Sequence, residues 1–174
     1  MSIGLPEFLD LARASRQPLE LVGRVRIGAL PRLGAALADN GGEASLELVA
    51  QDDGSGRILV HGEVGAALGL ICQRCLQPMR YEVAAAFDLV WVRSEAEMQS
   101  VQDESCDPLL STDGRVKLSD LIEDELLLAL PIVALHGKDE CNADRKIPDV
   151  NAQKPEIPAK QNPFAVLEQL KQRR

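Results

Sequence analysis

The sequence predicts an α+β fold: an antiparallel β-sheet covered by helices, followed by a flexible linker and a C-terminal helix. Two stretches, residues 58–71 and 79–92, alternate apolar and polar side chains, which is the pattern of strands with one buried face. About seven residues separate them, so we expect an antiparallel hairpin. Residues 119–130 carry apolar side chains at helical spacing, and this helix is expected to cover the apolar face of the sheet.

Four shorter elements are expected before the hairpin. Helical spacing predicts a short helix over residues 6–15 and a second one over residues 31–38. Alternating apolar residues predict strands over residues 19–27 and 45–50. The sequence DNGG, residues 39–42, is a strong turn signal between them. Because aromatic residues make up only 3% of the chain, the core is expected to consist mainly of Leu, Val, Ile and Ala.

The expected covering helix begins at Ser119, which suits an N-cap, and ends before Pro131. On a helical wheel its core-facing stripe consists of Leu118, Leu121, Ile122, Leu126, Leu128 and Ala129. Its opposite, solvent-facing side carries Asp120, Glu123, Asp124 and Leu127.

Glu125 differs from the other acidic residues of this helix because it projects into the middle of the apolar stripe. A buried carboxylate must be paired, hydrogen-bonded or protonated. We therefore expect Glu125 to be a buried acid. Its role is either structural, in an ion pair with an arginine such as Arg74 or Arg80, or that of a catalytic acid.

The domain organisation predicted from composition has three parts. Residues 1–141 form the α+β core domain, and residues 142–161 form a polar, proline-rich linker. Residues 162–174 form an amphipathic helix, which either folds back onto its own sheet or docks in the groove of a partner. The helix begins with Asn162 as N-cap and Pro163 at the first helical position, and the proposed docking residues are Asn162, Pro163, Phe164, Leu167 and Leu170.

The charge distribution limits the possible partners. The formal net charge of −8 argues against a nucleic-acid binder that relies on broad phosphate contact. Residues 95–125 hold ten acidic residues against two basic ones, whereas arginines near the N-terminus and the final KQRR leave local basic surface. The chain opens with no secretory signal and contains no apolar run long enough for a membrane span, so we expect a cytoplasmic protein without a membrane partner.

Two cysteines at the tip of the expected hairpin are the strongest candidates for chemistry. Cys72 and Cys75 have the spacing of half a tetrahedral zinc site, and His136 and Cys141 are the best candidates for the other half. The alternative is that these thiols are merely packed or idle. Thiol–disulfide catalysis is disfavoured, because the flanking segments are strands and not the helix N-terminus that lowers a thiol pKa in such enzymes. Cys106 is a spare cysteine outside this pattern.

Three stretches together carry a family resemblance. The segments ICQRCLQPMRYEV, DLIEDELLLALPIVALH and QNPFAVLEQLK occur here in the order and spacing of the bacterial large ribosomal RNA subunit accumulation proteins, the YceD family, which the chain resembles over residues 15–172. The resemblance implies a non-enzymatic role in the synthesis, processing or stability of 23S rRNA, and hence in large-subunit assembly. It implies ribosome assembly or rRNA-processing proteins as partners, with 23S rRNA contacted directly or through them.

Individual residues match the family's motifs. Cys72 and Cys75 match its cysteine pair, Glu125 matches its helix glutamate, and the Asn-Pro-Phe that starts at Asn162 matches its tail. Many relatives have two cysteines after the covering helix, where this chain has His136 and Cys141, so a structural zinc is compatible with the pattern. Two other functions stay open: a zinc- or thiol-dependent enzyme (an oxidoreductase or a nuclease), and a protein-binding module that docks through the C-terminal helix. No catalytic residue is assigned, since the sequence contains no Gly-x-Ser-x-Gly, His-Glu-x-x-His or dinucleotide-binding motif.

Overall fold

The computed structural model describes residues 2–101, 105–137 and 140–141, all within the compact unit Met1–Cys141. The expected linker over residues 142–161 and the expected C-terminal helix over residues 162–174, including its proposed docking residues, lie outside the described residues.

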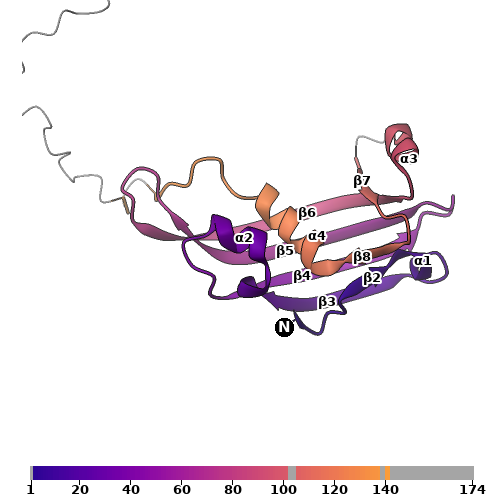
Figure 1. Ribbon diagram of the computed structural model, residues 1–174, viewed down its shortest axis with the longest axis horizontal. Coiled ribbons are helices and arrows are strands. Elements are labelled where there is room, and N and C mark those ends of the chain that lie inside the picture. Colours follow the sequence, from indigo (N-terminus) through magenta and orange to yellow (C-terminus); the bar gives the residue numbers. More distant parts are fainter. Residues whose placement is uncertain (1, 102–104, 138–139, 142–174) are drawn as a thin grey trace, which may run out of the picture. The chain divides into compact units, whose positions relative to one another are not determined.

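A six-stranded sheet forms the centre of this unit, with the strand order β1-β3-β4-β5-β6-β7 (Figure 1). All neighbours are antiparallel except the last pair, β6 and β7, which is parallel. The strands are β1 (Ser2–Ile3), β3 (Leu19–Arg26), β4 (Glu43–Asp52), β5 (Ile58–Ile71), β6 (Pro78–Val92) and β7 (Asp107–Leu110). The predicted hairpin is confirmed: β5 and β6 pair without interruption from Leu59 opposite Val90 to Ile71 opposite Pro78.

Among the described residues, one face of this sheet is covered by other elements and the other face is not. The cover consists of α2 (Pro31–Ala36), α4 (Leu118–Leu128) and a small two-stranded sheet of β2 (Phe8–Asp10) and β8 (Arg115–Lys117) (Figure 1). The remaining elements are α1 (Leu11–Ala14), a 3-10 turn η1 (Ile27–Ala29) and α3 (Glu95–Ser100). The core between the layers is aliphatic, as expected, and the predicted α+β class is confirmed. Its fully buried side chains include Leu9, Leu11, Ile27, Leu30, Leu33, Leu46, Leu68, Leu118, Ile122 and Leu126.

The predicted helix over residues 6–15 is wrong in its first half. Phe8–Asp10 is a strand that pairs with Arg115–Lys117, and the helix covers only Leu11–Ala14. The side chain of Asp10 caps this short helix by accepting the backbone N–H of Arg13 at 3.0 Å. Cross-strand pairing, with the guanidinium of Arg115 4.4 Å from the ring centre of Phe8, prevails over the helical spacing of the local sequence.

The covering helix α4 is confirmed, but its start and its orientation differ from the prediction. It begins at Leu118 after Lys117, without a side-chain cap, so Ser119 is not the N-cap. Its start is fixed by strand β8 and by the backbone N–H of Leu118, which donates to the carbonyl of Glu7 at 3.1 Å. Leu128, expected in the buried stripe, is 81% exposed, whereas Leu127, expected on the solvent side, packs against the core. Within the described ranges, α4 and the other helices are too short or too polar to cross a membrane.

Candidate metal centre

The connection between β5 and β6 is a tight turn that carries two cysteines; we call residues 72–77 the thiol turn. The backbone N–H of Cys72 donates to the carbonyl of Gln77 at 3.0 Å, and that of Leu76 donates to the carbonyl of Cys72 at 2.8 Å. Leu76 has a φ of 57°, a left-handed conformation that non-glycine residues rarely adopt. This backbone folds the turn back on itself and brings Cys75 close to Cys72.

A second segment, residues 131–137, follows α4 and runs beside the thiol turn. The backbone N–H of Gln73 donates to the carbonyl of Ala134 at 2.8 Å, as in a short stretch of sheet pairing. The guanidinium of Arg74 donates to the carbonyl of His136 at 3.1 Å. These bonds hold His136 beside the cysteines, although it lies 61 positions after Cys75 in the chain.

The four residues expected as metal ligands come together. The ligand atoms of Cys72, Cys75, His136 and Cys141 all lie within 4.8 Å of one another. The sulfur atoms of Cys72 and Cys141 are 3.9 Å apart, and the sulfur of Cys75 is 3.3 Å from Nδ1 of His136. Two thiolates bound tetrahedrally to one zinc, at a zinc–sulfur distance of about 2.3 Å, would lie about 3.8 Å apart. The donor set and its spacing therefore fit a single small metal ion. Cys106 is not part of this cluster.

The electrostatic environment favours a thiolate at Cys72. This side chain is fully buried, and burial raises its pKa. The backbone N–H groups of Cys75, His136 and Arg74 outweigh burial and lower the pKa of Cys72 to about 5. For Cys75, burial raises the pKa above its usual value. Arg74 donates its Nε–H to the sulfur of Cys141 at 2.9 Å, so a positive charge also lies against the cluster. Thiolates are the form in which cysteines bind metals.

The family model described as large ribosomal RNA subunit accumulation protein YceD matches residues 60–171, which include all four residues of the centre. The chain belongs to the YceD family. It is 28% identical over 172 residues to the large ribosomal RNA subunit accumulation protein YceD of Haemophilus influenzae, with 98% of each chain covered. No solved structure matches this YceD-family chain.

Glu125 of this YceD-family protein does not behave as the sequence predicted. It is half-buried, and in the part of the chain that the structure describes it forms no ion pair. The donors of Arg74 are directed at Cys141 and at the carbonyls of His136 and Gly137, so the expected pair with Glu125 is absent. Burial, followed by the nearby carboxylates of Asp107 and Asp124, raises the pKa of Glu125.

The buried acid of the YceD-family fold is instead Glu123, which was expected to face solvent. It is 2% exposed, and its carboxylate pairs with Arg32 of α2 at 3.0 Å. The sequence contained no direct signal for this pair. The only hint is that α2 begins with proline and has no side-chain cap of its own, so its N-terminal N–H groups need an acceptor from elsewhere.

An apolar groove borders the candidate metal centre of this YceD-family protein. It has a volume of about 340 Å³ and is lined by residues of the thiol turn, the end of β5, the segment after α2 and the segment after α4. Leu76 at its rim is 71% exposed, and Ile132 nearby is 97% exposed. Exposed aliphatic side chains concentrated in one place are typical of protein-binding surfaces.

Proposed function

We propose that this protein is a non-enzymatic factor in the synthesis, processing or stability of 23S rRNA and in assembly of the large ribosomal subunit, acting in the cytoplasm. Its membership of the YceD family carries the proposal, supported by the full-length match to a relative named for accumulation of large-subunit rRNA. Ribosome assembly or rRNA-processing proteins are the proposed partners, with 23S rRNA bound directly or through them.

We propose further that Cys72, Cys75, His136 and Cys141 hold a structural zinc ion. Four protein ligands fill a tetrahedral coordination sphere and leave no position for a water or a substrate, which is the arrangement of structural and not of catalytic zinc sites. When bound, the metal would supply a cross-link between the thiol turn and the segment after α4. The role of this cross-link is to hold the apolar groove in shape.

The same observations count against the enzymatic alternatives. A nuclease would need an open coordination position, which this ligand set does not offer. An oxidoreductase would need an accessible nucleophilic sulfur, whereas Cys72, the thiol with the lowered pKa, has 0% of its surface exposed.

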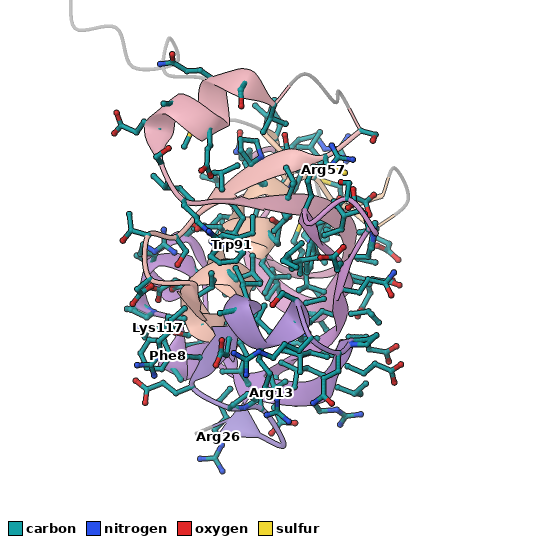
Figure 2. All side chains as sticks on the ribbon, turned by 90° about the vertical axis from the view of Figure 1, so that its right-hand side faces the viewer. Phe8, Arg13, Arg26, Arg57, Trp91 and Lys117 are labelled. Carbon is teal, nitrogen blue, oxygen red and sulfur yellow. The ribbon has the colours of Figure 1, made fainter. Side chains whose placement is uncertain are left out.

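The charge distribution argues against broad contact with RNA phosphates, because the net charge is −8 and the open face of the sheet carries exposed carboxylates. Glu47 and Glu63 lie directly opposite each other on β4 and β5, and both are exposed. The exposed arginines are scattered, among them Arg13 on α1 and Arg26 at the end of β3 (Figure 2). We propose action through protein partners, with any RNA contact restricted to small basic patches.

The experiment that tests the proposed role is a deletion of the gene in its own host. We expect a deficit of 23S rRNA relative to 16S rRNA, measured at fast growth and in the cold, and restoration by the intact protein. An unchanged ratio in both conditions would overturn the proposal. Complementation with Cys72→Ser, with its protein level measured, separates the role of the metal centre from the role of the protein as a whole.

A second, compatible function is that of a protein-binding module. The apolar groove is one surface on which a partner could bind, and the C-terminal tail is proposed as a separate docking segment. The tail residues Asn162, Pro163, Phe164, Leu167 and Leu170 are proposed to dock onto a partner. Truncation after Gln161 tests them: a stable product that fails to restore the rRNA ratio supports docking, and full restoration excludes it.

A further inference from the structure

One edge of the main sheet is open over most of its length. Strand β6 pairs with β5 along one side, but on its other side β7 covers only Leu89 to Val92. In the described part of the chain, no strand pairs with this side of β6 from Pro78 to Asp88. Such an edge presents a row of unpaired backbone donors and acceptors to any extended chain that approaches it.

The positions that carry these free groups follow from two hydrogen bonds. The carbonyl of Val92 accepts the N–H of Ser111 from the β7 side, and the carbonyl of Gln77 accepts the N–H of Cys72 from the β5 side. The pairing of β6 with β5 has no bulge, so backbone groups alternate regularly along the strand. The even-numbered residues of 80–88 therefore direct their N–H and C=O groups to the open edge.

Helix α4 lies on the covered face of the sheet, next to this edge. Its Glu123 side faces α2, the helix that follows β3, through the ion pair with Arg32. Leu121, Glu125 and Leu128, spaced four and three residues apart, occupy the opposite flank of this helix, which packs over β5 and β6. The carboxylate of Asp107, the first residue of β7, contributes to the raised pKa of Glu125, as expected if this flank lies close to the edge. The exposed Leu128 and the half-buried Glu125 thus border the space in which an added strand would lie. We call this space, between the free edge of β6 over residues 78–88 and helix α4, the lane.

The charges around this lane define its occupant. Four carboxylates border it: Glu82, Asp88, Asp107 and Glu125. Within the described stretch 78–88 of β6, Arg80 is the one basic residue. Within the described residues, only Asp88 among these acids has an ion-pair partner, His61. The side chains of an added strand alternate between the open face and the α4 side, so a strand with basic residues on both faces would meet carboxylates on each.

We propose that the lane between the free edge of β6 and helix α4 binds an extended, basic segment of a partner protein as an added β-strand. Main-chain hydrogen bonds to residues 80–88 supply the affinity, and the carboxylates supply the preference for lysine or arginine. The lane lies on the β7 side of β6, whereas the groove beside the four candidate metal ligands is lined by the end of β5, the thiol turn and the segments after α2 and α4. The inference goes beyond the proposed role in rRNA accumulation and does not depend on it.

The test is binding of a labelled peptide to the full-length protein, measured by fluorescence anisotropy. The probe is a fluorescein-labelled peptide in which lysine and valine alternate over about nine residues. Two control peptides match its length: one has glutamate in place of lysine, and one has proline in place of the valines. The proline peptide keeps the charge but cannot pair as a strand. We expect the lysine–valine peptide to bind and both controls to bind at least about tenfold more weakly.

Variants locate the binding. Ala84→Pro removes an N–H from the open edge while keeping the bonds to β5, and we expect about tenfold weaker binding. Glu125→Gln leaves the strand intact and is expected to weaken binding about threefold. Glu20→Gln removes an exposed carboxylate on the far strand β3 and serves as the matched control, with unchanged affinity. Should Ala84→Pro fail to fold, Glu125→Gln still decides.

Three results of the peptide-binding experiment would overturn the proposal: equal binding of the proline peptide, no binding of any peptide, or full affinity in the variants at the edge. Amide hydrogen exchange of the free protein gives an independent readout. We expect fast exchange at Ala84 and Ala86 that slows when the lysine–valine peptide is added. Slow exchange before addition would mean that another segment or a second copy already covers the edge, and would also overturn it.

Discussion

The carboxylate of Glu123 on helix α4 caps the N-terminus of helix α2 and pairs with Arg32 there. One carboxylate oxygen of Glu123 accepts the backbone N–H of Arg32 at 2.6 Å and that of Leu33 at 3.1 Å, and the other accepts the Nε–H of Arg32 at 3.0 Å. The first N–H groups of a helix have no partner inside the helix, and they favour a negative charge. Glu123 therefore joins the two covering helices by satisfying the N-terminus of one from the side of the other.

Replacing Glu123 is expected to destabilise the protein strongly. Glu123→Gln keeps the size but removes the charge that accepts three hydrogen bonds in a buried position, and we expect a loss of about 2–3 kcal/mol in the free energy of unfolding. The measurement is urea denaturation at neutral pH. Asp124→Asn is the matched control, because Asp124 also accepts from Arg32, at 2.7 Å, but is exposed, and we expect less than about 1 kcal/mol. Equal losses in the two variants would contradict the capping role of Glu123.

This cap also shows where sequence reasoning fails. The alternation along β5 and β6 is local, so the hairpin was predictable from the residues of the hairpin alone. The pair of Arg32 and Glu123 joins residues 91 positions apart, and a helical wheel of α4 cannot reveal that α2 needs an acceptor. The helical wheel placed Glu123 on the solvent side and Glu125 on the core side. A wheel takes no account of a second helix, α2, packed against the flank of α4.

The grouping of the four candidate metal ligands was predictable for a different reason. The spacing of Cys72 and Cys75 is a local signal, and His136 and Cys141 are the one histidine and the one cysteine that follow the expected helix in the sequence. The bonds that bring the two halves together, such as that from Gln73 to the carbonyl of Ala134, carry no sequence signature because they use the backbone. Donor chemistry could thus be predicted, whereas the path of the chain that assembles the donors could not.

Removal of the metal is the second prediction. If zinc links the thiol turn to the segment after α4, then purified protein contains about one zinc per chain, and a chelator lowers the melting temperature by about 5–10 °C. Cys72→Ser is expected to lose the metal and to melt at the same temperature with and without chelator. The measurements are elemental analysis and differential scanning calorimetry.

Two further variants sharpen this test. Cys106→Ser changes a cysteine outside the centre and is expected to keep both the metal and the melting temperature. His136→Cys creates a set of four thiol ligands and is expected to keep the metal. A chelator-insensitive protein that contains no zinc would show that the four residues are packed and do not bind a metal.

The third prediction concerns Gly62 on β5, whose position leaves no room for a side chain. A methyl group there would come within 2.8 Å of Cε2 of Phe87 and within 2.9 Å of the carbonyl oxygen of Glu47. We expect Gly62→Ala to lower the free energy of unfolding by about 2–3 kcal/mol through overpacking. Gly65→Ala on the same strand is the control, since its methyl group would meet Ser45 Oγ at 3.3 Å and nothing closer, and we expect a change below about 1 kcal/mol. Urea denaturation of the two variants decides, and similar stabilities would contradict the close packing of Phe87 on β5.

Glu125 provides the fourth prediction, which concerns pH. Burial and the carboxylates of Asp107 and Asp124 raise the pKa of Glu125 in the folded protein, so the folded state holds this proton more tightly than the unfolded chain does. The contribution of Glu125 to stability is therefore most favourable below the ordinary carboxyl pKa of about 4.3, and it is lost as the pH rises through the raised, folded-state value.

Glu125→Gln removes this titration and keeps the shape of the side chain. At pH 7 the variant is expected to be more stable than the unmodified protein by a few tenths of a kcal/mol, since partial exposure weakens the effect through solvent screening. Near pH 3 the difference is expected to vanish, because the carboxyl is then protonated in both the folded and the unfolded state. Chemical denaturation at the two pH values, with Glu20→Gln as an exposed control, measures the difference. A variant less stable than the unmodified protein at pH 7 would mean that Glu125 has a stabilising partner. The expected result, a more stable variant, would mean that the carboxylate of Glu125 lowers the stability of the free protein. A site next to an open strand edge that binds a basic peptide is expected to carry such an unpaired carboxylate.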